Sequence, residues 1–180
     1  MKIFDHVGAD VQRTDTKVQL AIRQIAFARQ YSLALLDSIP DDRWCEMPAG
    51  AGTHIAWQAA HLAVGEYALC MFRQRGPEPE DRDLLPGDWL KRFGKDSKPD
   101  PDPSANPTAE EIRRVLHAVH QQAMQELEAY PAEHFEQSVP EPFTAYETKL
   151  GALLFCAQHE MVHAGQIGLL RRLMGLEPLR

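Results

Sequence analysis

The chain is poor in cysteine, and its three cysteines form no Cys-x-x-Cys pair. Cys45, Cys70 and Cys156 cannot all pair within one chain, so we expect a reduced environment. The chain also lacks any apolar run approaching the 18 residues of a membrane-spanning helix, and its beginning, MKIFDHVGAD, is not a charged-then-apolar leader. These absences predict a soluble, cytoplasmic protein without a membrane partner.

Basic charge is scarce as well. The sequence has 19 Lys and Arg residues against 26 Asp and Glu residues, for a net charge of -7. Nucleic-acid surfaces need clustered Lys and Arg to hold phosphates, so this balance argues against a nucleic-acid partner. The length of 180 residues, with 44% hydrophobic and 25% charged residues, is ordinary for a globular protein, and we expect a single domain over residues 1–180.

Hydrophobic residues recur with the period of a helix in four segments, each ended by proline or glycine. The first three cover about residues 16–38, 54–75 and 108–130, and the fourth ends at Gly175. The apolar stripe of the first segment includes one charged residue, Arg29. The expected residues at the helix starts are Asp15 or Thr16, Thr53, Thr108, and Thr144 or Thr148.

The connection between the second and third segments is unusual. Residues 76–107 contain seven prolines, so no long helix forms there, yet the segment is too long for a turn. Its apolar patch of Trp89, Leu90 and Phe93 can pin it to the helices. A crossover of this length can return along a whole helix and leave helices 2 and 3 parallel. The expected fold is therefore all-α, a four-helix bundle with a long crossover between helices 2 and 3.

The last helix carries two histidines where the core should be. Unpaired buried imidazoles cost roughly a few kcal/mol, whereas one divalent ion satisfies two histidines that lie one turn apart. Core histidines bonded to backbone or water are the alternative. At 100° per residue the inward face comprises Ala152, Phe155, Cys156, His159, Val162, His163, Gln166, Leu170 and Leu173.

Residues 159–163 also read HEMVH, a literal HExxH. Zinc metalloproteases use this string with the histidines as ligands and the glutamate as general base. Their third ligand normally lies downstream, but only 17 residues follow His163, and they contain one acid, Glu177, and no histidine. The longer protease motif also fails, because Gln166 stands where it requires glycine. We therefore rank a metalloprotease below other enzymes and seek the third ligand upstream.

His61, at the centre of the apolar stripe of the second helix, is the upstream candidate. Gly65, one turn further on, would leave space beside a metal for water or substrate. His54 could equally be the ligand, or could lie near solvent at the helix start. His117 and His120 on the third helix form a weaker pair, for which a solvated face is the default interpretation.

Together, His61, His159 and His163 can fill three of the four positions around zinc. The remaining position would be open to water or substrate, which is a catalytic rather than a structural arrangement. Gln166, one turn beyond His163, could bond a ligand water or an outer-shell group.

Two motifs in this chain resemble the DinB-like superfamily. Residues 53–67 contain W-x-x-x-H-L, and residues 159–175 read H-E-x-x-H-A-G-Q-I-x-x-L-R-R-x-x-G. Trp89, Phe93 and the string PTAEE at residues 107–111 are similar too, so the resemblance covers nearly the whole chain.

The resemblance implies a DinB-type bundle, often dimeric, that binds nickel, zinc or another divalent ion through three histidines. Carried over by position, these are His61, His159 and His163. Members of the superfamily include bacillithiol transferases, mycothiol-dependent isomerases, the N-terminal domain of ergothioneine-forming sulfoxide synthases, metal-dependent hydrolases and many proteins without an assigned activity. The substrate therefore does not transfer.

The leading hypothesis is a metal-dependent enzyme whose ion, zinc or nickel, lowers the pKa of a bound thiol or water. A low-molecular-weight thiol would attack an electrophile as in a thiol S-transferase, whereas water would make the protein a hydrolase. Glu160, at the edge of the ligand face, could be a general base, with a solvated or capping role as the alternative. The rival hypothesis is a non-enzymatic stress or binding protein whose metal only stabilises the fold. A homodimer is expected from the resemblance alone.

Overall fold

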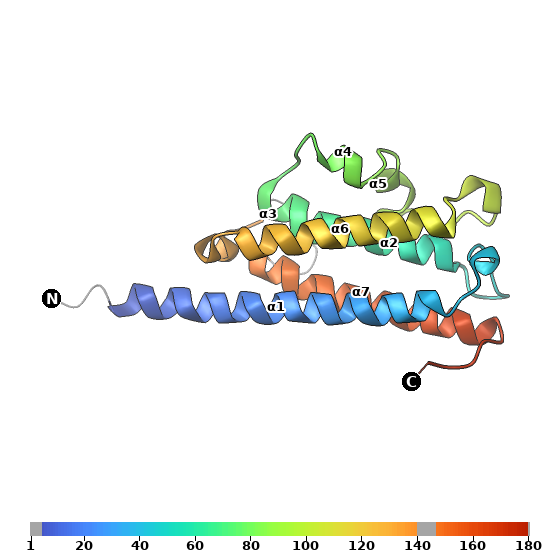
Figure 1. Ribbon diagram of the computed structural model, residues 1–180, viewed down its shortest axis with the longest axis horizontal. Helices are drawn as coiled ribbons and strands as arrows, with labels where there is room; N and C mark the ends of the chain where they lie inside the picture. The colour runs from blue at the N-terminus through green and yellow to red at the C-terminus, as the bar shows by residue number, and fades with distance from the viewer. Residues whose placement is uncertain (1–4, 140–146, 180) are drawn as a thin grey trace.

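The computed structural model describes the backbone of residues 5–139 and 147–179, and side chains from residue 16 onward. Four long helical segments dominate it (Figure 1). Short helical turns lie between them, and the described residues contain no strand beyond an isolated bridge between Ser138 and Thr148. The predicted all-α class is confirmed. The long segments are α1 (Asp5–Asp37), α2 (Ile55–Glu66) with its continuation η2 (Tyr67–Phe72) and α3 (Arg73–Arg75), α6 (Ala109–Ala129) and α7 (Lys149–Leu173).

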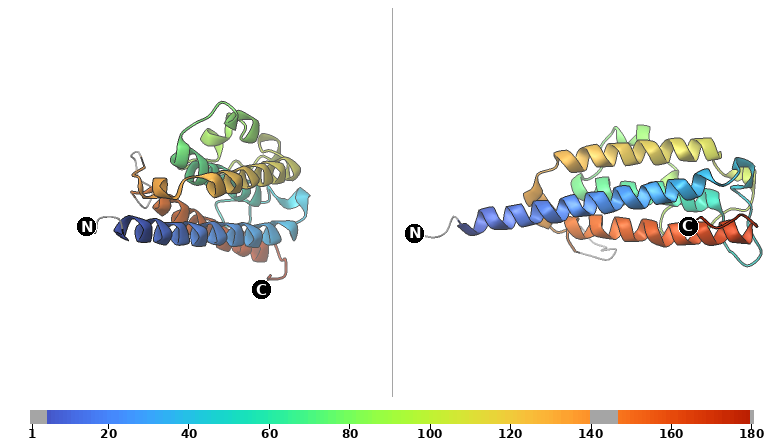
Figure 2. Two further views of the ribbon diagram at one scale, coloured as in Figure 1. Left: turned by 60° about the vertical axis from the view of Figure 1, so that its left-hand side comes forward. Right: turned by 60° about the horizontal axis from the view of Figure 1, so that its bottom comes forward.

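The long helices lie side by side along the length of the molecule. Helices α1 and α7 pack together and run in one direction, while α2 and α6 pack together and run in the other (Figures 1 and 2). Contacts between α2 and α7 join the two pairs. No helix among the described residues is long and apolar enough to cross a membrane.

The crossover between α3 and α6 passes over the α2 and α6 side of the molecule (Figure 1). It contains the short helices α4 (Asp81–Leu84), α5 (Trp89–Arg92) and η3 (Pro103–Ala105). Trp89 and Phe93 are buried and pack edge to face with 5.1 Å between ring centroids. Burying such a ring contributes roughly 2 kcal/mol, so these two residues anchor the crossover as the sequence predicts. Leu90 does not share this role, because it is 52% exposed.

Most helix ends follow local chemistry. The hydroxyls of Thr108 and Thr148 accept hydrogen bonds from the backbone N–H groups of Glu111 and Gly151, which confirms both as N-caps. Gly175, beyond the end of α7, adopts the positive φ that usually needs glycine. Thr144, the other candidate start of the last helix, lies outside the described residues. The remaining short turns are η1 (Asp41–Arg43) and η4 (Ala132–Glu136).

Two predicted helix starts are wrong. Helix α1 already begins at Asp5, so neither Asp15 nor Thr16 caps it. The cap of α2 is His54 rather than Thr53, because the imidazole Nδ1 of His54 accepts from the N–H of Trp57. The hydroxyl of Thr53 instead accepts from the side-chain amide of Gln58.

Candidate metal centre

Three histidines converge between α2 and α7. One ring nitrogen from each of His61, His159 and His163 lies within 4.8 Å of the other two. The Nε2 atoms of His61 and His159 are 3.1 Å apart. His61 comes from the middle of α2, and the other two lie one turn apart on α7, as the helical periodicity predicts. The same face was predicted to bury Val162 and Leu173, but these are 62% and 50% exposed.

The geometry of this cluster fits a divalent ion. Zinc binds imidazole nitrogen at about 2.0–2.1 Å, so two nitrogens on one ion lie about 2.9 Å apart at a right angle and about 3.3 Å apart at the tetrahedral angle. The 3.1 Å between the Nε2 atoms of His61 and His159 falls between these values. Imidazole nitrogens suit zinc, nickel, copper and iron alike. The donor set therefore fits metal binding without selecting the metal.

Two of the rings are oriented by acceptors on their far side. Nδ1 of His61 lies 2.6 Å from the backbone carbonyl oxygen of Phe93, and Nδ1 of His163 lies 2.6 Å from Oε1 of Gln58. Because a carbonyl oxygen only accepts, Nδ1 must carry the proton in both rings, which leaves Nε2 with a free lone pair. A hydrogen bond of this kind fixes the tautomer and the ring plane of metal-binding histidines.

The third ring, His159, is held by packing. A Cβ atom added at Gly65 would lie 2.9 Å from Cε1 and 3.2 Å from Nδ1 of His159. The prediction that Gly65 leaves room for water or substrate is therefore wrong, because the imidazole of His159 fills that space. Trp57 completes the enclosure by stacking on His61, with 4.8 Å between ring centroids and an interplanar angle of 8°.

Burial keeps the three histidines neutral. It lowers the pKa of His159 to about 4, with a further contribution from His61. It lowers the pKa of His163 to about 3, helped by His159 and His61. Burial also lowers the pKa of His61, although the Phe93 carbonyl opposes the shift. Metal binding requires deprotonated imidazole, so the rings are in a ligand-competent state at neutral pH.

Glu160, the candidate general base, points elsewhere. Its side chain is 3% exposed, and its Oε2 lies 3.0 Å from Nη2 of Arg29 on α1. It lies in the middle of α7, whose N-cap is Thr148. The alternative of a solvated or capping role is therefore wrong, because the carboxylate is buried in an ion pair. Its role as a general base stays a prediction.

The other residues that the sequence suggested as ligands or partners lie outside the trio. Gln166 is exposed, and its side chain hydrogen-bonds His163. His54 is buried, and its Nε2 is bonded to the carbonyl of Asp100, so it is neither near solvent nor part of the trio. His117 is exposed, whereas Nδ1 of His120 lies 2.7 Å from Oε1 of Glu66, which corrects the solvated interpretation of His120.

Gln58 was not identified as a functional residue from the sequence. It is 1% exposed and is the hydrogen-bond partner of His163. Its position three residues before His61, on the same helical face, was the available signal. The Phe93 carbonyl had no such signal, because every residue has a backbone carbonyl.

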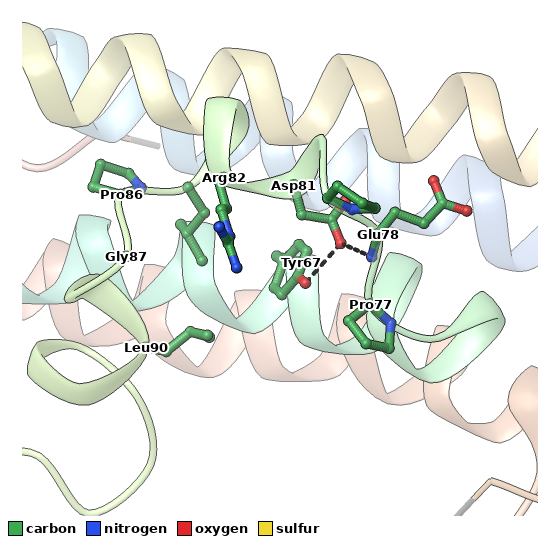
Figure 3. A pocket seen from close by; sticks show the side chains of 10 residues that line it. Tyr67, Pro77, Glu78, Asp81, Arg82, Pro86, Gly87 and Leu90 are labelled. Atoms are coloured by element: carbon green, nitrogen blue, oxygen red, sulfur yellow. Dashed lines mark hydrogen bonds between the residues drawn. The ribbon is translucent and has the colours of Figure 1, made fainter.

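Among the described residues, three hollows are lined in part by the crossover. One, of about 480 Å³, is walled by Tyr67, Asp81, Arg82 and Leu90 (Figure 3). Asp81 accepts hydrogen bonds there from the hydroxyl of Tyr67 and the N–H of Glu78. None of the three converging histidines lines this hollow, and neither Trp57 nor Phe93, which contact His61, belongs to its lining.

The smallest hollow, of about 260 Å³, is not lined by the three histidines either, but its lining includes Trp57 and Phe93, which contact His61. Trp57 stacks on His61, and the Phe93 carbonyl binds the same ring. This hollow also has two exposed lysines in its lining, Lys91 and Lys98. It is therefore the hollow with a direct structural link to the centre.

Comparison with protein families agrees with the geometry. The family model of the DinB superfamily matches residues 24–167, which include all three histidines. The chain belongs to the DinB superfamily. This membership confirms the resemblance, and together with the histidine cluster it is compatible with metal binding. A search of the curated proteins gives no match.

Proposed function

We propose that this DinB superfamily protein is a divalent-metal-dependent enzyme that acts on a small molecule, as a thiol S-transferase or a hydrolase. The observation that carries the proposal is the convergence of His61, His159 and His163, with ring nitrogens within 4.8 Å of one another. The hydrogen bonds from Nδ1 of His61 and His163 place the proton of each ring on Nδ1, so Nε2 is the nitrogen that can bind a metal.

The number of protein donors supports a catalytic site. Within the part of the chain that the structure describes, the cluster contains three histidines and no fourth His, Cys, Asp or Glu ligand. Structural zinc sites are closed by four protein ligands, whereas catalytic sites keep a position for water or substrate. When bound, a divalent ion supplies Lewis acidity that lowers the pKa of a coordinated thiol or water.

The hollow that adjoins His61 favours a small anionic substrate, because its lining contains Lys91, Arg92 and Lys98 against one acid, Asp100. Part of such a molecule can occupy the hollow of about 260 Å³ beside Trp57 and Phe93. Lys91 and Lys98 in its lining attract a carboxylate, a group that many low-molecular-weight thiols carry. Zinc or nickel is the ion we propose. We also propose a cytoplasmic homodimer, and light scattering that shows only monomer would reject the dimer.

Elemental analysis of untagged protein tests the metal site. We expect near-stoichiometric metal in the wild type and its loss in His61→Ala and His163→Ala. His117→Ala is the matched control, because His117 is exposed on α6 and outside the trio. Metal that is absent from the wild type, or retained in both trio variants, would contradict the proposal.

A second measurement separates the enzyme from a protein with a purely structural metal. The enzyme should transform thiol and electrophile pairs, or hydrolyse esters and amides, only with metal restored. A structural metal predicts a large loss of thermal stability on chelation with no turnover, because binding to the native state adds to folding free energy.

A further inference from the structure

A buried charged cluster joins all four long helices next to the histidine trio. Nη2 of Arg29 on α1 lies 2.7 Å from Oε2 of Glu66 on α2 and 3.0 Å from Oε2 of Glu160 on α7. Oε1 of Glu66 lies 2.7 Å from Nδ1 of His120 on α6. Arg29, Glu66 and Glu160 are 1%, 1% and 3% exposed. One guanidinium amino group therefore binds two helices at once.

Stability alone does not explain this cluster. Among the described residues, Nε and Nη1 of Arg29 and Oε1 of Glu160 are buried without a hydrogen-bond partner. Desolvating such groups is costly, and replacing a whole buried ion cluster by apolar residues is often neutral or stabilising. Buried charges of this kind are best attested as devices that select one arrangement of helices over others.

The apolar residues of α2 and α7 do not by themselves select one arrangement of these two helices. Many of the residues they bury are alanines, whose short side chains interlock weakly with a facing helix. A shift of one residue along a helix moves a side chain by about 1.5 Å and turns it by about 100°. Even a partial shift would separate nitrogens that must meet on one ion. The buried alanines are Ala56, Ala59, Ala60 and Ala63 on α2, and Ala152, Ala157 and Ala164 on α7.

The two carboxylates stand directly beside the residues that shape the centre. Glu160 follows His159 in the chain, and Glu66 follows Gly65, against which the ring of His159 packs. We propose that Arg29 is a positioning residue, whose guanidinium binds Glu66 and Glu160 and so fixes the register of α2 and α7 that brings His61 to His159. The inference rests on the proposed metal site for its function, although the register itself can be measured without metal.

The test removes the cluster without leaving a buried charge. In the triple variant Arg29→Met, Glu66→Gln, Glu160→Gln, no carboxylate loses its partner while staying ionised. The matched control is Arg75→Met, Asp81→Asn, Glu126→Gln, because Arg75 also hydrogen-bonds two carboxylates but lies outside the trio. Circular dichroism reports folding, and Co²⁺ titration with its visible absorption reports metal affinity and geometry. We expect the cluster variant to bind Co²⁺ about tenfold to a hundredfold more weakly, with an altered spectrum, and the control to match the wild type.

Nitrogen-15 NMR of the histidine rings provides the readout without metal. In the wild type we expect protonated, hydrogen-bonded Nδ1 in His61 and His163, and a ring-to-ring Overhauser effect between His61 and His159. In the cluster variant we expect these signals to be weakened or lost. If the wild-type protein shows the ring signals but binds no Co²⁺, the metal function is rejected. Loss of the ring signals in the cluster variant would then still support the positioning role.

A folded cluster variant with wild-type ring signals and wild-type Co²⁺ binding would overturn the positioning role. If the triple variant does not fold, Arg29→Lys supplies the test. Lysine keeps the charge, but its side chain is shorter and its ammonium is a compact point charge, so we expect partial retention of the ring signals and weaker Co²⁺ binding. Unchanged behaviour of Arg29→Lys in both measurements would then overturn the proposal.

Discussion

Two polar clusters lie inside this protein, and they are satisfied in opposite ways. The histidines are uncharged, and Nδ1 of two of them is hydrogen-bonded away from the centre, so one nitrogen of each ring converges on the same point. In the cluster of Arg29, Glu66 and Glu160, opposite charges meet each other directly. Imidazole nitrogens that converge from two helices indicate a ligand site, whereas paired charges indicate an interaction within the fold. The comparison assigns a binding role to the first cluster and an organising role to the second.

The largest expected loss of stability comes from removing one charged side chain from its buried partners. Arg29→Met leaves the Glu66 and Glu160 carboxylates buried together without the guanidinium that binds both, and should lower the free energy of unfolding by about 3–5 kcal/mol. Urea denaturation of the metal-free protein measures it. His61→Ala removes an uncharged group from the other cluster and should cost clearly less in the same metal-free assay. Equal losses in the two variants would remove the distinction between the clusters.

An intermediate effect should come from Gly65→Ala. The new methyl group would lie 2.9 Å from Cε1 of His159 and would push that ring out of place. Because metal affinity depends on ring placement, we expect a loss of about tenfold to a hundredfold in affinity for zinc, measured by competition with a chromogenic chelator. Gly168→Ala is the control, because a Cβ atom there meets nothing within 4 Å and alanine favours the helix. Wild-type affinity in Gly65→Ala would show that His159 is not held by this contact.

The smallest expected effect comes from Asp81→Asn, in the charged cluster of Arg75, Asp81 and Glu126, which lies nearer to solvent. Burial opposes the shift, yet hydrogen bonds from Arg75, the N–H of Glu78 and the hydroxyl of Tyr67 lower the pKa of Asp81 below its ordinary value. The folded state therefore favours the carboxylate, and its stabilisation is present above the unfolded pKa and is lost as pH falls through the folded pKa. Asp81→Asn should cost about 1–2 kcal/mol at pH 7, since hydrogen bonds to a charged group are lost.

The same measurement at low pH checks the sign. Wild type and Asp81→Asn should begin to converge in stability as the pH falls below the ordinary pKa of an aspartic acid, about 3.8, and should meet below the lowered folded pKa, where the wild-type carboxyl is neutral as well. Thermal unfolding from pH 7 down to pH 3 follows the difference. A gap that widens toward low pH would mean that the carboxylate does not stabilise the fold.

The sequence predicted what depends on periodicity. Helical spacing brought His159 and His163 inward and placed His61 on a facing stripe, which predicted a shared metal site, and the resemblance assigned the same three residues. Capping chemistry identified Thr108 and Thr148, because a hydroxyl before an apolar run has a specific bonding role.

Other features depend on packing between distant segments. The His159 ring reaches Gly65, and the crossover supplies the Phe93 carbonyl, contacts that periodicity within one helix does not contain. The apolar stripe of the first helix contained Arg29, but a long charged side chain can also reach solvent from such a stripe. Its partners Glu66 and Glu160 became evident only once the helices were packed together.

The hydrogen bond between His61 and the carbonyl of Phe93 bears on which changes this protein can accept over evolutionary time. A carbonyl belongs to the backbone, so replacing the Phe93 side chain by another apolar group keeps the bond available. An insertion or deletion between Trp89 and Phe93 would carry the carbonyl away from the ring. This stretch of the crossover should therefore tolerate changes of residue type far better than changes of length.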